Sequence, residues 1–147
     1  MPDYTERFSE AWQLIDFHYG AGVAANTEVN TGYNLLANFH RIVIIIHPVA
    51  LNDALDIDIE EATSTAGAGA QAFDATLHDI TVAAADTEPS VIEIQTEELT
   101  VTSKMDCLNV EITTANTQGG SNYFVVEIWG MPRFQPAVTT NLDSVTD

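Results

Sequence analysis

Basic side chains are almost missing from this sequence. Four of its 147 residues are basic and 22 are acidic, so the formal net charge is -18. A protein binds nucleic acid by replacing phosphate counterions with Lys and Arg side chains, and anionic membranes attract the same residues. We therefore expect no nucleic acid and no membrane among the partners, which should be basic or apolar. Solubility alone, or adaptation to a salty medium, would also account for the charge.

Cysteine and long apolar runs are just as scarce. Cys107 is the only cysteine, so no disulfide forms within the chain, and its place in a strand-like run predicts a small buried hydrophobe. The longest apolar run, Ile42 to Ile46, is far shorter than the roughly 20 residues of a membrane helix. The first residues show neither the basic nor the apolar region of a secretory signal. The sequence predicts a soluble protein made in the cytoplasm.

Helical periodicity is weak, whereas strand periodicity is strong. Only residues 3–15 place large side chains at helical spacing (Phe8, Trp12 and Ile15), which predicts one short helix. In contrast, 41 of the 147 residues are Val, Ile or Thr, which favour strands. Alternating apolar and polar side chains predict three strands, each with one buried and one wet face, at residues 53–60, 108–113 and 123–129.

Further strands follow from other signals. Residues 41–47 (RIVIIIH) are apolar on both faces, which predicts a central strand covered from two sides. Turn residues at Gly20–Gly22 and at His47-Pro48 separate some of the segments. Residues 62–75, rich in Ala, Gly and Thr, predict a long loop across the sandwich edge. Weaker strands are predicted at residues 11–18, 24–31, 78–83 and 92–94.

Many short strands with turn residues between them are typical of a β-sandwich or barrel. We expect an all-β fold, a jelly-roll-like β-sandwich of about eight antiparallel strands. The sandwich would occupy residues 11–130 as one domain. Residues 1–10 would form an extended N-terminal arm, and residues 131–147 an extended C-terminal arm.

Motifs for catalysis or metal binding are missing too. The acidic stripe Asp53, Asp56, Asp58 and Glu60 follows one predicted strand, where side chains line a wet surface instead of converging on one ion. The four histidines are dispersed and match no zinc spacing, and no nucleophile elbow or complete phosphate loop occurs. The sequence therefore predicts no metal, no cofactor and no enzymatic activity. The enzymatic alternative is a small jelly-roll hydrolase or epimerase. A separate, binding alternative is that the acidic stripe contacts an ion or a basic partner.

Aromatic side chains gather near the two ends of the sequence. Aromatic residues on terminal arms either fold back as caps of the core or anchor in the pockets of a partner. The second use predicts a set of partner-contact residues, which also includes one arginine: Tyr4, Phe8, Trp12, Trp129, Arg133 and Phe134.

The stretch RIVIIIHPVALNDALDIDIEEATSTAGAGAQAF resembles tailed-phage capsid decoration (cement) proteins. In that family an apolar strand is followed by a strand that ends in a Glu/Gln-Glu/Gln-Ala-Thr run, and a Gly-Ala-Gly-Ala loop comes next. The matching residues are Ile42–Ile46, Leu55–Ile59, Glu60-Glu61-Ala62-Thr63 and Gly67-Ala-Gly-Ala70. The later stretches SVIEIQTEELTV and MDCLNVEITTA look like the closing strands of the same family. The resemblance covers residues 11–130.

The resemblance implies a β-sandwich or jelly roll that binds the outer surface of an assembled phage capsid. Such proteins oligomerise, often as trimers, and clamp neighbouring subunits of the major capsid protein. It therefore implies a virion location, a homo-oligomer and the major capsid protein as partner. Two alternatives stay open. One is a carbohydrate- or receptor-binding module of a fibre or tail, which exposed aromatics on one sheet face would favour, and the other is a tail or connector protein.

Overall fold

The fold is known from a computed structural model that describes residues 11–73, 79–100, 103–116 and 119–133. A short 3-10 turn at Thr96–Glu98 follows the eighth strand. The described part of the chain contains no helix with the length and hydropathy of a membrane span. The strands, in chain order, are β1 (Gln13–Ala24), β2 (Glu28–Asn30), β3 (Asn34–Leu35), β4 (Phe39–Ala50), β5 (Leu55–Ala62), β6 (Gln71–Ala72), β7 (Ile80–Val82), β8 (Ser90–Gln95), β9 (Cys107–Thr114) and β10 (Ser121–Pro132).

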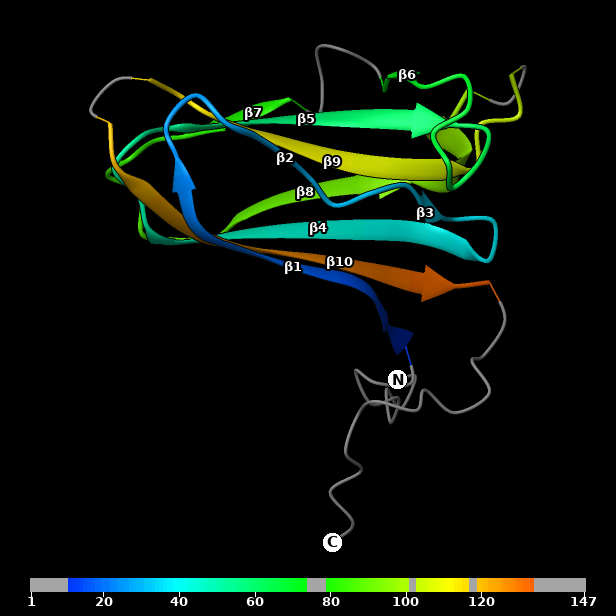
Figure 1. The fold of residues 1–147 in the computed structure, drawn as a ribbon. Helices are drawn as coiled ribbons and strands as arrows, with labels where there is room; N and C mark the ends of the chain where they lie inside the picture. Colours follow the sequence, from blue (N-terminus) through cyan, green and yellow to red (C-terminus); the bar gives the residue numbers. More distant parts are fainter. Residues whose placement is uncertain (1–10, 74–78, 101–102, 117–118, 134–147) are drawn as a thin grey trace, which may run out of the picture.

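Two antiparallel sheets lie one above the other (Figure 1). The four-stranded sheet has the order β1-β10-β4-β8. In the six-stranded sheet β9 and β5 are central, β2 and β3 pair with β9, and β6 and β7 pair with β5. Apart from the two-residue β3 and β6, eight strands remain, four in each sheet, in the order of a jelly roll. The predicted jelly-roll-like sandwich of about eight strands is confirmed.

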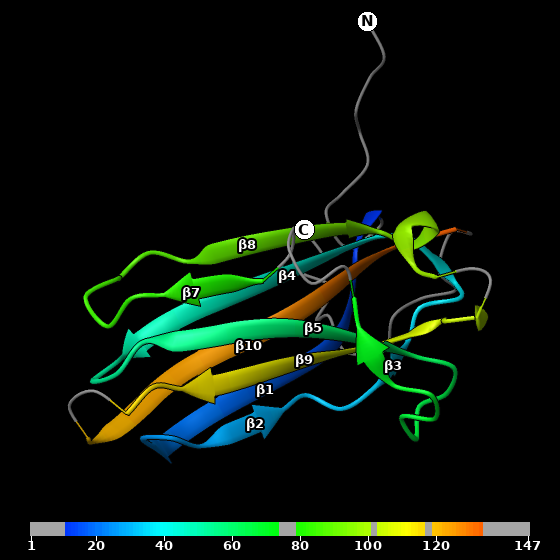
Figure 2. The ribbon, with the colours of Figure 1, turned by 90° about the horizontal axis from the view of Figure 1, so that it is seen from above.

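The core lies between the two sheets, because each strand buries alternate side chains. Figure 2 shows β5 and β9 above β4 and β10. The predicted alternation of residues 53–60 and 123–129 is confirmed over the strands that they contain, and Cys107 is buried as predicted. In residues 108–113 the alternation is only partly confirmed, because Asn109 of the predicted wet face is buried and donates hydrogen bonds to Asn30 and Glu60. Burying one such aliphatic side chain stabilises the fold by roughly 1.5–3 kcal/mol. Each of the following is at most 1% exposed: Ile42, Ile44, Ile46, Leu55, Ile57, Ile59, Leu108, Val110, Ile112, Phe124, Val126 and Ile128.

The first strand confirms one prediction and corrects two others. The strand predicted over residues 11–18 is confirmed from Gln13 onward, as the first part of β1. The helix predicted over residues 3–15 is wrong from Gln13 onward, where β1 begins; residues 3–10 lie outside the described residues. Pairing with β10 along almost its whole length stabilises β1 and outweighs the weak helical spacing. The turn predicted at Gly20–Gly22 is also wrong, since β1 continues to Ala24 through a register irregularity. Gly20 makes this path possible, because a Cβ atom there would lie 2.4 Å from the Phe124 ring.

Three later predictions need correction. The strand predicted over residues 24–31 shortens to β2, because the chain turns from one sheet to the other around Asn26, which has a φ of 54°. His47-Pro48 does not end its strand: β4 runs to Ala50, and Pro48 is tolerated because β8 reaches only as far as Ile46. The loop from residue 62 does not cross the sandwich edge. It closes a hairpin in which β6 pairs with the end of β5.

Asp53 does not belong to the wet face of the acidic stripe. It lies before β5 begins and is fully buried, as is Asn122. The Asn122 Oδ1 atom accepts hydrogen bonds from the backbone N–H groups of Asn52 and Asp53, each at 2.9 Å. Asp53 therefore belongs to the turn that joins β4 to β5, and only Asp56, Asp58 and Glu60 face outward.

Candidate functional site

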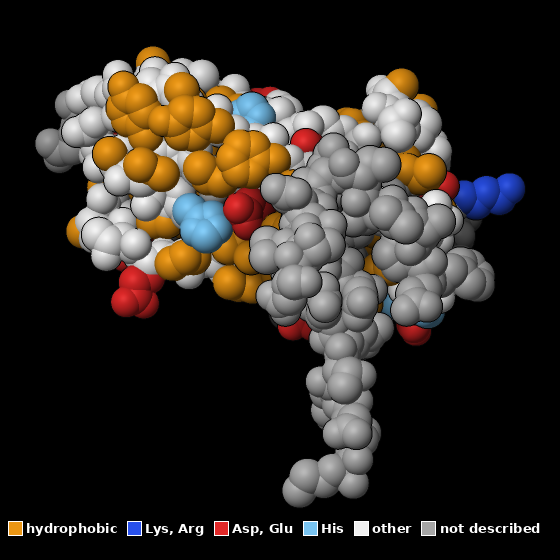
Figure 3. Space-filling model, turned by 90° about the horizontal axis from the view of Figure 1, so that it is seen from below, with side chains coloured by type: hydrophobic (Ala, Val, Ile, Leu, Met, Phe, Trp, Pro, Cys, Tyr) orange, Lys and Arg blue, Asp and Glu red, His pale blue; other side chains and the backbone are white. Residues whose placement is uncertain are grey.

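Exposed apolar side chains concentrate on the outer face of the four-stranded sheet. Figure 3 looks onto this side of the molecule, where hydrophobic side chains gather. Of the eight exposed large hydrophobic side chains in the described residues, only Leu35 lies on the other sheet. Half-buried Val43, Ile45, Val125 and Trp129 complete the surface. We call the following set the apolar face: Leu14, Phe17, Tyr19, Val43, Ile45, Val91, Tyr123, Val125 and Trp129.

Strand register arranges the apolar face in rows across the sheet. In one row Phe17 of β1 lies opposite Glu127 of β10, which lies opposite Ile45 of β4, which lies opposite Val91 of β8. In the next row Leu14, Trp129, Val43 and Glu93 follow in the same strand order. Successive side chains of a strand point to opposite faces of the sheet, and the neighbours of these residues along each strand face the core. The side chains in these rows therefore all point outward.

The aromatic members form a line along the β1–β10 pair. Trp129 lies level with Leu14, Phe17 with Glu127 and Tyr19 with Val125, and Tyr123 comes two residues further along β10. Successive aromatic side chains are therefore about two residues, or roughly 7 Å, apart along the strands. The β4–β8 side of the same face is aliphatic.

One polar group stands in the middle of the apolar face. The Trp129 indole Nε1–H donates a hydrogen bond of 3.0 Å to Glu127 Oε2. His47 Nε2 lies 3.7 Å from the same oxygen, is itself buried, and has no hydrogen-bond partner among the described residues. At the β8 edge Arg41 and Glu93 form an exposed ion pair of 2.9 Å. The face is thus apolar and carries little net charge.

The outer face of the six-stranded sheet has the opposite character. None of the described Lys and Arg residues lies on β2, β5, β7 or β9. Asp58 and Glu111 lie directly opposite each other on β5 and β9, an unfavourable pairing of like charges. Burial, together with neighbouring carboxylates, raises the pKa of both groups. We call the following set the acidic face: Glu28, Asp56, Asp58, Glu60, Asp79 and Glu111.

Tyr33 is tied to this acidic face. Its hydroxyl donates a hydrogen bond of 2.7 Å to Glu60 Oε2. Burial, this hydrogen bond, and the charges of Glu60 and Glu111 raise the pKa of Tyr33 to about 12. Its phenol therefore stays protonated at neutral pH and remains a donor.

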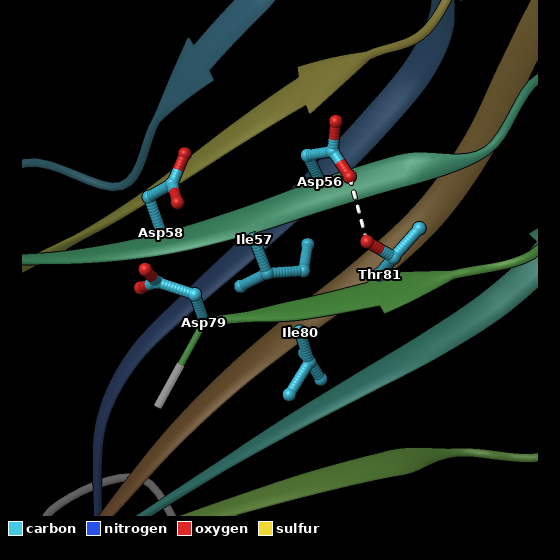
Figure 4. A pocket seen from close by; sticks show the side chains of 6 residues that line it. All are labelled: Asp56, Ile57, Asp58, Asp79, Ile80 and Thr81. Carbon is cyan, nitrogen blue, oxygen red and sulfur yellow. Dashed lines mark hydrogen bonds between the residues drawn. The ribbon is translucent and has the colours of Figure 1, made fainter. Parts of the chain in front are cut away.

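A hollow of about 200 Å³ lies between β5 and the start of β7. Figure 4 shows Asp56 beside Thr81, whose hydroxyl donates a hydrogen bond of 2.8 Å, with Asp58 and Asp79 at the other end. Within the described residues, no three His, Cys, Asp or Glu side chains are grouped so that they could hold a metal ion. The hollow is a gap in a charged surface, and its carboxylates do not converge.

The predicted contact residues fall partly on the apolar face. Trp129 belongs to it. Trp12 immediately precedes β1, and Arg133 immediately follows β10, at the corner where Gln13 pairs with Gly130. Arg133 is engaged within the chain, since its Nε donates to the Phe39 carbonyl at 3.0 Å and its terminal nitrogen to Thr96 Oγ1 at 3.2 Å. Tyr4, Phe8 and Phe134 lie outside the described residues.

The sequence reasoning did not select Phe17, Tyr19 and Tyr123 as site residues. The signal was present in residues 41–47, which are apolar on both faces. The opposite sheet covers Ile42, Ile44 and Ile46, but no described strand covers Val43 and Ile45 from outside. Within the described chain, the strand at residues 41–47 is therefore covered on one face only, and not on both as predicted.

No family model and no curated protein matches this chain. Among solved structures it is similar to tobacco streak virus coat protein, with 7% identity, 98% and 99% of the two chains covered, and a TM-score of 0.42. A structure of infectious bursal disease virus (Gx strain) matches with 10% identity and a TM-score of 0.44; the match covers 84% of this chain but only 32% of that one. A Family 11 carbohydrate-binding module from Clostridium thermocellum, in complex with a β-1,3-1,4-mixed-linked tetrasaccharide, matches with 17% identity, 92% and 96% coverage, and a TM-score of 0.37.

Proposed function

We propose that this chain is a structural, non-enzymatic virion protein that binds the outer surface of a phage capsid and stabilises it by bridging subunits of the major capsid protein. The observation that carries the proposal is the apolar face. A chain with a net charge of -18 needs no such surface for solubility, and contiguous apolar patches on soluble proteins mark interaction sites. Its aromatic side chains are of the kind that dominate binding energy at protein interfaces.

The virion role rests on the sequence resemblance. The motif Glu60-Glu61-Ala62-Thr63 lies at the end of β5, and Gly67-Ala-Gly-Ala70 lies in the hairpin loop between β5 and β6. Both segments thus occupy places in the fold that suit the strand and the loop of the resemblance. Bridging is multivalent: weak contacts made by each subunit become tight once an oligomer engages several capsid sites together.

Co-purification tests this proposal. Particles are purified on a density gradient from cultures that produce the protein, and its copy number is measured against that of the major capsid protein. We expect a fixed, stoichiometric ratio that high salt lowers only weakly, because an apolar contact is not screened. Absence of the protein from purified particles would contradict the proposed role.

A carbohydrate-binding role is the second candidate, and the line of four aromatic side chains favours it. Trp129, Phe17, Tyr19 and Tyr123 offer successive ring surfaces along the β1–β10 pair, and Glu127 offers a hydrogen-bonding group between them. A glycan array with the intact chain decides between the two functions. Binding to one glycan class that Tyr19→Ala abolishes would favour this candidate over capsid binding.

A further inference from the structure

The apolar face resembles one half of a protein core. No described strand lies on its outer side (Figure 1), and Phe17, Tyr19 and Val91 are 55%, 51% and 60% exposed. We propose that a second copy of this chain covers the apolar face, sheet against sheet, about a two-fold axis that lies in the face and runs along the strands. The proposal stands on the face alone and does not require a role in a virion. A second copy and a capsid would compete for this face, so the dimer is the state of the free protein.

Charge restricts where two copies can meet. Each copy carries a net charge of -18, and two such bodies repel each other wherever acidic surfaces approach. At the β8 edge of the apolar face Arg41 balances Glu93 at 2.9 Å, so Glu127 is the remaining carboxylate among the described residues of this face, with His47 beside it. Contact at this face places the two acidic faces on opposite outer sides of the pair. A back-to-back dimer is therefore the arrangement that brings apolar surfaces together while keeping like charges apart.

The size of the face suits a stable dimer. β1, β4 and β10 have 12 residues each, so these strands are about 40 Å long, and four strands span about 15 Å between the outermost axes. Because β8 has only six residues, the flat area is about 500 Å². The side chains project from this plane and increase the surface that can be buried. Stable interfaces bury about 800 Å² on each partner. One sheet face is thus comparable in size with a standard interface.

The face is also complementary to itself, as a two-fold interface requires. Its β1–β10 half is aromatic and its β4–β8 half is aliphatic. A two-fold axis along the strands lays the aromatic half of each copy on the aliphatic half of the other. In the row that runs from Phe17 to Val91, Phe17 of one copy then faces Val91 of the other.

The polar group fits the same arrangement. His47 lies one step along the strands from the row of Glu127, since His47 pairs with Val125 and Ile45 pairs with Glu127. The two-fold axis brings His47 of each copy close to Glu127 of the other. The buried Nε2 atom of His47, which has no hydrogen-bond partner in the described part of the chain, gains an acceptor in this way. Two His47–Glu127 contacts between the copies then replace the 3.7 Å approach of the same two side chains within each chain.

Sedimentation equilibrium of the full chain at tens of micromolar tests the proposal. At about 0.5 M salt, where the screening length is about 4 Å, we expect twice the monomer mass of 16.0 kDa. Phe17→Asp and Val91→Asp should each weaken the dimer by roughly 30-fold or more, the effect of losing an interface hot spot. Leu35→Asp is the matched control, because Leu35 is 47% exposed but lies on the other sheet; it should leave the mass unchanged. A monomeric or trimeric chain, or equal effects of all three substitutions, would overturn the proposal.

Crosslinking tests the orientation of the two copies. A Phe17→Cys chain is mixed with a Val91→Cys chain and treated with a thiol crosslinker of about 10 Å reach, the separation of packed sheets. Cys107 is fully buried and does not compete. We expect a crosslinked dimer in the mixture and little with either chain alone. Efficient crosslinking of the Phe17→Cys chain alone would refute the axis along the strands. A monomeric chain that still co-purifies with capsids would overturn the dimer and leave the proposed function intact.

Discussion

Glu61 is a buried carboxylate without a basic partner among the hydrogen bonds and ion pairs of the described chain, and its replacement should be costly. It is 1% exposed at the end of β5. Its Oε2 atom accepts a hydrogen bond of 2.8 Å from the Thr100 N–H group. Its Oε1 atom accepts a bond of 2.6 Å from Gln71 Nε2 and a short one from the Thr100 hydroxyl. The carboxylate thereby ties β5 to β6 and to the segment after the 3-10 turn.

Glu61→Gln keeps the shape of this side chain but removes one acceptor oxygen. If the amide oxygen occupies the Oε1 position, the NH₂ group faces the Thr100 N–H group; in the other orientation it faces Gln71 Nε2. In the first orientation the Thr100 N–H group loses its acceptor, and in the second the exposed Gln71 amide has to turn over to present its oxygen. In both orientations the remaining hydrogen bonds are no longer made to a charged group. Hydrogen bonds to charged groups contribute about 1.5–3 kcal/mol, and an unsatisfied buried donor costs about 1–3 kcal/mol. We expect the free energy of unfolding to fall by about 2–4 kcal/mol.

Urea denaturation followed by circular dichroism measures this loss. Glu97→Gln is the matched control, since Glu97 is exposed and the substitution removes the same charge. The control corrects for the relief of repulsion that follows from removing any negative charge from so acidic a chain. Equal stability of the two variants would refute the reasoning, because it would mean that the three donors do not depend on the carboxylate.

Three further predictions concern packing and charge. Gly130→Ala should lower the free energy of unfolding by about 1–3 kcal/mol, because the added Cβ atom would lie 2.4 Å from Phe39 Cδ1; a thermal melt unchanged from the wild type would contradict this. Glu111→Gln should raise the free energy of unfolding by roughly 0.5 kcal/mol at neutral pH. Burial and repulsion from neighbouring carboxylates raise the pKa of Glu111, and both disfavour the folded state only when the group is ionised, so their cost is lost as pH falls through the raised pKa. The gain should therefore disappear in acid, and a loss of stability at neutral pH would count against this prediction. Burial and Asp106 raise the pKa of Cys107 from 9.0 to about 11, so the thiol of the unfolded chain ionises first as pH rises. The free energy of unfolding should therefore fall by up to about 3 kcal/mol between these two pH values. Cys107→Ala should show a smaller fall over that range, and an equal fall would mean that Cys107 does not cause it.

Much of the fold could be predicted because alternation has a direct physical cause. In residues 53–60 every second side chain is aliphatic, and the strand that forms there buries Leu55, Ile57 and Ile59 as expected. Local signals failed where long-range pairing decided the structure. β1 is a strand because β10 lies beside it, and the irregularity at Gly20–Gly22 extends that pairing instead of ending it. The local pattern predicts a strand only over residues 11–18, and it does not show that the strand continues past Gly20.

The candidate site was harder to predict for a related reason. Residues 41–47 showed that a strand had two apolar faces, but the sequence did not show which of them the second sheet would cover. Phe17 and Tyr19 come from a strand whose register was unknown, so they could not be placed beside Glu127 and Val125. Asp53 looked like part of an exposed stripe because its hydrogen-bonding partner, Asn122, lies 69 residues away. Sequence periodicity shows that a face exists, and only the topology shows which residues share it.

Covalent footprinting of aromatic side chains tests most directly whether the apolar face is the interaction surface. Hydroxyl-radical labelling is compared between the protein in its native assembly and the protein diluted to the monomer. We expect Tyr19, Tyr123 and Trp129 to be protected in the assembly, whereas Tyr33, on the acidic face, keeps its labelling rate. Protection of Tyr33 with unchanged labelling of the other three would contradict the account and would transfer the interface to the opposite sheet.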